Sequence, residues 1–330
     1  RRICATSAFV FTRRKRIFCI RDLKDACTEE NAPHHGWLRD RWQDIEQSLL
    51  DTSLKPRLAE DLPEPPCKKC RLTSEDVYVP LSQSTIWDQS ASFYKRVGMQ
   101  AWENGTVPYG ISSSGVMAGY YADKLDYLYS TFVVDRSQPM YVLELGSGHM
   151  KLGYLVLTML HRRYVERERS MGSRPSRFPF KFILCDVCED IVINRSKAEC
   201  FQRFVRAGFL DFSCWDCLST SVNSVPLVCS GTMLKLKSVS SGLAVFTNYY
   251  FDSLPTDLYM WGDGGSNSHP LEIVVSKRNV SAFKKRSVDN LEARVSNPSL
   301  RKYIQSHRSP GKYFSVPVGA AQCVHNVKQL

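Results

Sequence analysis

The sequence predicts an α/β fold in which parallel strands alternate with helices. The first reason is the run Tyr141-Val-Leu-Glu-Leu-Gly-Ser-Gly-His149, where an apolar segment ends in an acid and a Gly-x-Gly turn. This run is too short for a helix and suits a strand buried on both faces. The second reason is the helical spacing of the apolar residues between Leu152 and Tyr164. Strand, glycine turn and helix together form the nucleotide-cradling unit of doubly wound α/β folds.

Three further apolar runs are expected to continue this sheet. Phe180–Asp186 reads as a second strand, and a helix then runs from about Ile191 to Ala207 and stops at Gly208. A third strand is predicted at Phe209–Phe212 and a fourth at Gly242–Asn248. Polar residues recur where these strands end, at the edge where an open α/β sheet binds its ligand. A helix cap or a turn former is the alternative interpretation of each polar residue taken singly.

The glycine turn favours one class of nucleotide over another. Gly146 and Gly148 have no Cβ, so a ligand can lie close against the backbone. The dinucleotide fingerprint has a third glycine where this chain has Met150, which argues against NAD. S-adenosylmethionine carries no phosphate, and Glu144 could take up the positive charge of its amino group. An ordinary buried strand with a tight turn is the competing interpretation.

Several segments of the chain resemble those of a known enzyme family. They are Ala101–Pro108, Ile111–Ser114, Glu144–Gly148, Ala207–Phe212, Asn248–Pro255 and, more faintly, Ser315–Ala320. On these residues the chain resembles class I S-adenosylmethionine-dependent methyltransferases over roughly residues 85–330. It is most similar to a branch near the MidA group, which includes the mitochondrial arginine methyltransferase of complex I assembly.

The resemblance implies a Rossmann-like methyltransferase sheet and a set of site residues. The methionine end of the cofactor would be held at the glycine turn, the ribose hydroxyls by an acid after the second strand, and the adenine near an acid after the third. The implied cofactor residues are Glu144, Gly146, Gly148, Asp186 and Asp216. Asn248 would stand beside the methyl donor and orient the acceptor, and Asp252 would assist as a base.

The run Asn248–Pro255 also bears on the methyl acceptor. It lacks the Asn/Asp-Pro-Pro-aromatic signature of enzymes that methylate exocyclic base amines, and by family likeness it points toward protein. Two features depart from the family pattern. Met150 replaces a glycine, so its side chain is expected to intrude on the pocket. The pattern after Ser315–Ala320 continues into three more strands, whereas this sequence stops at Leu330, so we expect a sheet without its last strands or a sequence that omits part of the protein.

Charge is concentrated in three segments of a chain whose net charge is +11. Residues 1–21 carry seven Arg or Lys and no acid, residues 162–181 seven basic and two acidic residues, and residues 277–312 ten basic and two acidic. Basic segments around an acidic body favour a polyanionic partner. The Arg-rich start, which lacks Met, is typical of a mitochondrial import presequence. A simple chain boundary is the alternative, and a retained segment would form a basic arm for RNA phosphates.

These features predict three regions and a leading function. Residues 1–84 would form a basic arm and extension. Residues 85–135 would form a helical cover of the cofactor cleft, with helices at about Ile86–Trp102 and Val116–Thr131. Residues 136–330 would form the Rossmann-like domain with a basic insertion at 277–312. The leading hypothesis is a methyltransferase-like assembly factor of the mitochondrial matrix that binds ribosomal RNA or ribosomal assembly proteins within a larger complex. The alternatives are an active protein arginine methyltransferase of the MidA type and a catalytically inactive scaffold.

Twelve cysteines raise the question of a metal site. Zinc needs four convergent ligands, and Cys67/Cys70 is the best candidate for half of such a site, but no second half is apparent. The pairs Cys185/Cys188 and Cys214/Cys217 read as small hydrophobic residues near strand ends. We therefore expect no metal. The chain also has no apolar run of the length that a transmembrane helix requires, so no membrane span is expected.

Overall fold

The structure is a computed structural model. It describes residues 8–13, 16–20, 77–107, 109–110, 112–133, 135–172, 177–218, 224–235, 239, 241–262, 270–277, 282–288, 313–316 and 318–329. Cys67 and Cys70, together with most of the segment 1–84, lie outside these residues. None of the described helices combines the length and the apolar character needed to cross a bilayer.

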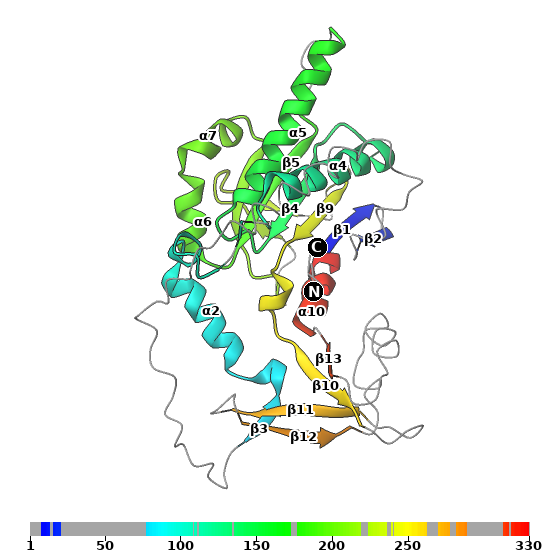
Figure 1. The fold of residues 1–330 in the computed structure, drawn as a ribbon. Coiled ribbons are helices and arrows are strands. Elements are labelled where there is room, and N and C mark those ends of the chain that lie inside the picture. The colour runs from blue at the N-terminus through cyan, green and yellow to red at the C-terminus, as the bar shows by residue number, and fades with distance from the viewer. Residues whose placement is uncertain are drawn as a thin grey trace, which may run out of the picture.

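A six-stranded sheet lies at the centre of the described chain, in the order β2-β1-β9-β4-β5-β6 (Figure 1). The strands β9, β4, β5 and β6 are parallel to one another. Since β5 and β6 extend the sheet on one side of β4 and β9 lies on the other, the order of the strands reverses between β4 and β9. Open α/β sheets bind ligands at such a reversal, beyond the carboxyl ends of the strands. The parallel strands are β4 (Met140–Leu145), β5 (Phe180–Asp186), β6 (Leu210–Cys214) and β9 (Leu243–Thr247).

Each face of this sheet contributes alternate side chains to a separate core. Val142, Phe182 and Phe246 point to one face and pack against helices, whereas Leu143 and Ile183 point to the other. The helices on the first face are α4 (Gly115–Phe132), α5 (Lys151–Ser170), α6 (Glu189–Ser196) and α7 (Glu199–Arg206). The second face packs against the hairpin of β7 (Val225–Pro226) and β8 (Met233–Leu234) and against Cys323 of α10 (Val318–Gln329). The predicted mixed α/β class is therefore confirmed.

Two predicted helices are each divided in the structure. The expected helix at Ile86–Trp102 is α2 (Ile86–Val97) followed by α3 (Gln100–Glu103), because Gly98 takes a φ of +56° and ends the first. The expected helix at 191–207 is α6 followed by α7. Here the Ser196 hydroxyl donates to the Ile193 carbonyl and Ala198 is extended, which interrupts the helical backbone.

The other predicted elements agree with the structure to within a few residues. The predicted helix at 116–131 is α4, whose N-cap Ser114 accepts a hydrogen bond from the Met117 amide at 3.3 Å. The predicted helix at 152–164 is α5, which continues to Ser170. All four strands are present at the expected places.

The basic start of the chain contributes to the sheet, which the sequence did not predict. Strands β1 (Ala8–Arg13) and β2 (Arg16–Ile20) form an antiparallel hairpin, and β1 pairs with β9 in the register Ala8↔Thr247. Part of the predicted basic arm therefore extends the central sheet beyond β9.

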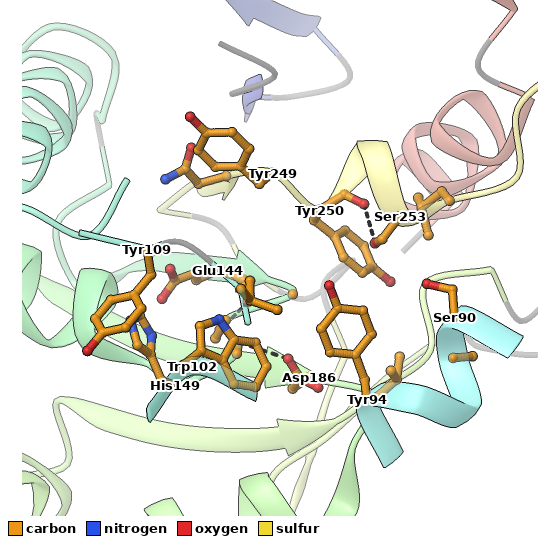
Figure 2. A pocket seen from close by; sticks show the side chains of 18 of the residues that line it. Ser90, Tyr94, Trp102, Tyr109, Glu144, His149, Asp186, Tyr249, Tyr250 and Ser253 are labelled. Carbon is orange, nitrogen blue, oxygen red and sulfur yellow. Dashed lines mark hydrogen bonds between the residues drawn. The ribbon is translucent and has the colours of Figure 1, made fainter. Parts of the chain in front are cut away.

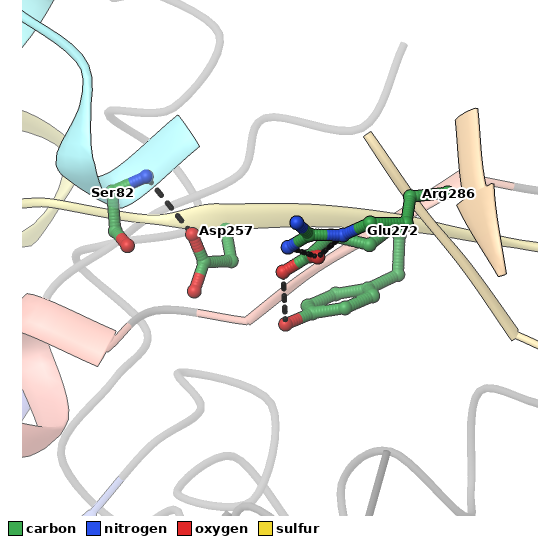
Figure 3. A network of polar contacts seen from close by, with 5 residues as sticks. Ser82, Asp257, Glu272 and Arg286 are labelled. Carbon is green, nitrogen blue, oxygen red and sulfur yellow. Dashed lines mark hydrogen bonds and ion pairs between the residues drawn. The ribbon is translucent and has the colours of Figure 1, made fainter. Parts of the chain in front are cut away.

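A second, antiparallel sheet consists of four strands that follow β9 in the chain and of β3, which precedes α2. It lies at the opposite end of the described structure from α5 (Figure 1). Its strands are β3 (Tyr78–Pro80), β10 (Asp257–Trp261), β11 (Pro270–Ser276), β12 (Phe283–Ser287) and β13 (Tyr313–Val316). Figure 3 shows its polar contacts. The buried Glu272 pairs with Arg286, whose Nε lies 3.0 Å from Oε2, and the Ser82 amide donates to Asp257 at 2.9 Å. Strand β12 is an edge strand made from the predicted basic insertion.

Candidate functional site

A cavity of about 380 Å³ lies at the carboxyl ends of the central strands. It is bounded by the turn after β4, by the ends of β5 and β9, and by residues of α2 and of the segment that precedes α4. Of the residues predicted from the sequence, those that line it are Glu144, Gly146, Gly148, Asp186, Asp216 and Asn248. Asp252 is not among the lining residues and is exposed in the short turn Phe251–Ser253. The structure thus brings six of the seven predicted residues together around one cavity.

The two glycines of the turn are required by their surroundings as well as by their backbone. Gly146 has a φ of +63°, and a Cβ on it would lie 2.3 Å from the ring of Tyr250. Gly148 has a φ of +52°, and a Cβ there would lie 2.7 Å from the ring of Trp102. Both conformations are left-handed, which favours glycine. Two aromatic rings therefore rest directly on the turn.

Met150 does not intrude on the cavity, contrary to the prediction. Its backbone has a φ of +66°, the left-handed conformation that a glycine in this place would adopt readily. Its side chain is fully buried in the core against the helices rather than among the cavity residues. A non-glycine residue in this conformation costs on the order of 1 kcal/mol, which burial of the thioether side chain offsets.

A third glycine supports the turn, and the sequence analysis missed it. Gly153, in the first turn of α5, lies so close to β4 and β5 that a Cβ would be 2.3 Å from Glu144 Oε2 and 2.4 Å from Leu184 Cδ2. Close helix–strand packing is the role of the third glycine in nucleotide-binding turns. The spacing Gly146-x-Gly148-x₄-Gly153 was visible, but a glycine inside a helical pattern gives no local sign of what lies opposite it.

Glu144 is a buried acid beneath this turn, with 3% of its surface exposed. Burial raises its pKa from an ordinary value of 4.5 to about 8, and the nearby Gly153 amide and Ser147 hydroxyl only partly oppose this change. Its Oε2 has no hydrogen bond of normal geometry to any described residue. A buried carboxyl group in this state gains most from a ligand that carries a positive charge.

Asp186 connects the second strand to the glycine turn. Its Oδ2 accepts a hydrogen bond from the Gly148 amide at 2.8 Å, and its Oδ1 accepts one from the Cys188 amide at 2.9 Å. Burial raises the pKa of this carboxyl group, while the hydrogen bonds from the backbone amides lower it in part. Each carboxylate oxygen has more than one lone pair, so ligand hydroxyls can donate to the same group.

The end of β9 is fixed on both sides of an exposed tyrosine. Asn248 Nδ2 donates to the Ser112 carbonyl at 2.7 Å and so ties the strand to the segment before α4. Tyr250 is half-buried, and its hydroxyl lies 3.2 Å from Cys217 Sγ. Between them Tyr249 has a φ of +59° and is 45% exposed at the cavity. Strained backbone of this kind is concentrated at functional sites.

Aromatic side chains supply much of the cavity wall, and none of them was among the predicted site residues. Figure 2 shows Tyr109 and His149 on one side of the Trp102 ring, and Asp186 and Tyr94 on the other. Tyr94 comes from α2 and Trp102 from α3, so helices far from the glycine turn in sequence complete the site. Helical spacing predicted these helices and the resemblance implied that they cover the cofactor cleft, but neither indicated which of their side chains line the cavity.

No protein-family model and no curated protein matches this sequence. Two solved structures from Burkholderia thailandensis are similar to it. The first is described as an uncharacterised member of a protein superfamily. It is 13% identical to this chain with a TM-score of 0.39, and the match covers 76% of this chain and 53% of that protein. The second belongs to the same superfamily and is described as a "likely methyl transferase" bound to S-adenosylhomocysteine. It is 14% identical to this chain with a TM-score of 0.42, and the match covers 76% of this chain and 55% of that protein. The chain spans about half the length of these proteins. Likeness at this level says nothing about which ligand the chain binds.

The charges around the cavity are mostly negative. Its lining includes four carboxyl groups and one lysine, namely Asp88, Glu144, Asp186, Asp216 and Lys95. This balance contrasts with the net charge of +11 for the whole chain. An acidic and aromatic cavity disfavours phosphate groups and favours a cationic or zwitterionic ligand with an apolar part.

The cysteines near the cavity are buried free thiols. Cys185 and Cys217 belong to one hydrophobic core and Cys188 to the other, and Cys214 is half-buried against the core that contains Cys188. These positions agree with their interpretation as small hydrophobic residues. Within the part of the chain that the structure describes, no three His, Cys, Asp or Glu side chains are grouped so that they could hold a metal ion.

Proposed function

We propose that this protein binds S-adenosylmethionine in the cavity beyond β4 and acts as a methyltransferase with a Rossmann-like sheet. The observation that carries the proposal is the convergence of Glu144, the Gly146–Gly148 turn, Asp186 and Asn248 at the reversal between β4 and β9. In this assignment Glu144 holds the cofactor's ammonium group, Asp186 its ribose hydroxyls, and Asp216 lies near the adenine. Open sheets place nucleotides at this position.

The charge of the site separates this ligand from a dinucleotide. A pyrophosphate would have to lie against the turn that Glu144 and Asp186 flank, where the acid Asp186 disfavours it and Glu144 offers no positive charge to hold it. S-adenosylmethionine has no phosphate, and its ammonium and sulfonium groups suit an acidic and aromatic cavity. Met150 does not oppose this assignment, because its side chain turns into the core.

The residues present favour catalysis by placement. Bound S-adenosylmethionine supplies a methyl group on a positively charged sulfur. The chain's contribution is to hold the donor and the acceptor in line, which is a large part of the rate enhancement in such reactions. Asn248 and the exposed Tyr249 stand where an acceptor would approach. Asp252 lies outside the cavity lining, so its assignment as a base has no support from the geometry. A protein arginine acceptor of the MidA type stays a prediction.

Calorimetric titration tests the proposal. S-adenosylmethionine and S-adenosylhomocysteine are expected to bind at submillimolar concentration, while ATP and NAD are not. Asp186→Asn should weaken binding at least tenfold, because it removes the charge that the ribose hydroxyls meet and disturbs the hydrogen bond to Gly148. Asp252→Asn is the matched control and should leave the affinity unchanged. Absence of binding by the wild-type protein up to millimolar cofactor would refute the proposal.

A second candidate function is supported by the edge strand β12. All five of its residues are exposed, and Lys284 and Lys285 are basic, whereas the neighbouring Arg286 is already paired with Glu272. We propose that this edge binds RNA phosphates, in keeping with the predicted role in mitochondrial ribosome assembly. The location in mitochondria and the ribosomal partner stay predictions. Binding to ribosomal RNA should weaken steeply between low and physiological salt as counterions are released. An affinity that does not depend on salt would contradict this role.

A further inference from the structure

His149 is a cavity residue to which the proposed function assigns no role. It follows Gly148 directly, and its imidazole is held between two aromatic rings. The Trp102 ring is stacked on it with a centroid distance of 5.9 Å and an angle of 29°, and the Tyr109 ring meets it edge-on at 4.3 Å and 85° (Figure 2). Its orientation is therefore fixed by packing.

The hydrogen bonds of the imidazole leave one nitrogen without a protein partner. Nδ1 accepts a hydrogen bond from the Lys151 amide at 3.4 Å, so the ring proton is assigned to Nε2. Nε2 is buried and has no hydrogen-bond partner among the described residues. A buried donor without a partner is unfavourable, and the site gains free energy when a ligand supplies the acceptor.

The surroundings of His149 indicate the charge of that acceptor. Burial, and then the charges of Lys151 and Arg195, lower the pKa of the imidazole to about 4, so that it is neutral at physiological pH. The same two cations, and the amino end of the twenty-residue helix α5, give this part of the cavity a positive potential. Glu144, on the strand before the turn, instead favours a positively charged group of the ligand.

We propose that His149 Nε2 donates a hydrogen bond to the carboxylate of the cofactor's methionine half, while Glu144 receives its ammonium group. The two ends of one zwitterion would then lie on two differently charged sides of the Gly146–Gly148 turn. This inference rests on the proposed function, since it names a contact within the same site.

Two ligands that differ in the amino acid part test this contact. S-adenosylhomocysteine contains the carboxylate, whereas 5′-methylthioadenosine has the nucleoside and the sulfur but no amino acid. His149→Phe keeps a ring between Trp102 and Tyr109 and removes the donor, and His149→Gln keeps a donor. His161→Phe is the matched control, because the imidazole of His161, on α5, also lies among aromatic rings but does not line the cavity.

Calorimetry should show that His149→Phe weakens S-adenosylhomocysteine about tenfold to a hundredfold, since a hydrogen bond to a charged group is lost. It should change the affinity for 5′-methylthioadenosine less than about twofold, which also shows that the pocket is intact. His149→Gln should restore part of the loss, and His161→Phe should change neither ligand. Equal weakening of both ligands, or no weakening of either, would overturn the inference. Failure of wild-type protein to bind either ligand would instead refute the proposed function.

Discussion

Replacement of Glu144 by glutamine should make the protein more stable at neutral and alkaline pH while it weakens cofactor binding. Burial raises the folded-state pKa of Glu144 to about 8, whereas the unfolded chain has an ordinary value near 4.5. Between these values the folded protein holds a proton that the unfolded chain has lost. The contribution of Glu144 to stability is therefore fully present below about pH 4.5 and is lost as the pH rises through about 8. Glutamine resembles the protonated acid and cannot ionise, so the variant keeps this contribution to stability at high pH.

The difference in stability between variant and wild type should accordingly depend on pH. It should be close to zero near pH 4.5 and reach on the order of 5 kcal/mol above pH 8, at about 1.4 kcal/mol for each unit of pKa shift. Urea denaturation at a series of pH values measures this difference. Glu272→Gln is the control, because Glu272 is equally buried but paired with Arg286, and its loss should destabilise the protein. A stability difference for Glu144→Gln that stays constant with pH would contradict the expectation.

The same substitution should reveal why a destabilising acid is present. An ionised Glu144 attracts an ammonium group, so the wild-type affinity for S-adenosylhomocysteine should rise between about pH 6 and about pH 7.5, below the range where the ligand's amino group loses its proton. Glu144→Gln should bind weakly and without this dependence. Acids that lower stability in a site commonly serve a ligand.

Gly153→Ala should be the most disruptive single methyl addition in the region of the turn. The new Cβ would lie 2.3 Å from Glu144 Oε2 and 2.4 Å from Leu184 Cδ2, and both side chains are buried and cannot move into solvent. Either α5 shifts away from β4 and β5 or the two side chains leave their positions. We expect a loss of about 2–3 kcal/mol in the free energy of unfolding, measured by urea denaturation, together with loss of cofactor binding.

Gly115→Ala provides the matched control for this prediction. Gly115 also lies in the first turn of a helix, but its added Cβ would make only an ordinary contact of 3.8 Å with Met159. Alanine favours the helix, so this variant should be as stable as the wild type or slightly more stable. If the two variants had equal stability, the close approach of α5 to the sheet would not be a constraint on the fold.

The elements that could be predicted are those whose burial produces a local pattern of apolar residues in the sequence. Strand β5 and helix α4 were located from apolar runs and helical spacing, since burial on both faces or on one stripe imposes a local pattern. The divisions at Gly98 and Ala198 were missed, because a helical apolar pattern continues across a turn that changes only the backbone direction. The pairing of β1 with β9 joins segments more than 200 residues apart and leaves no comparable signal.

The residues of the candidate site also fall into those that could be predicted from the sequence and those that could not. Glu144, Gly146, Gly148 and Asp186 stood out because acids and glycines at strand ends are unusual in apolar surroundings. His149, Gly153 and Trp102 did not, because each of these residue types is common in cores and helices. Their importance comes from what lies opposite them.

The sequence by itself determined the α/β class, the parallel strands and the position of the glycine turn. Only the tertiary structure decided that the acids gather around one acidic and aromatic cavity and that Met150 faces the core. It also decided that His149 Nε2 has no hydrogen-bond partner within the part of the chain that the structure describes. The physical reason is that hydrophobic periodicity is set by local geometry. Contacts across a cavity depend instead on how distant elements pack, and that is fixed only when the whole chain folds.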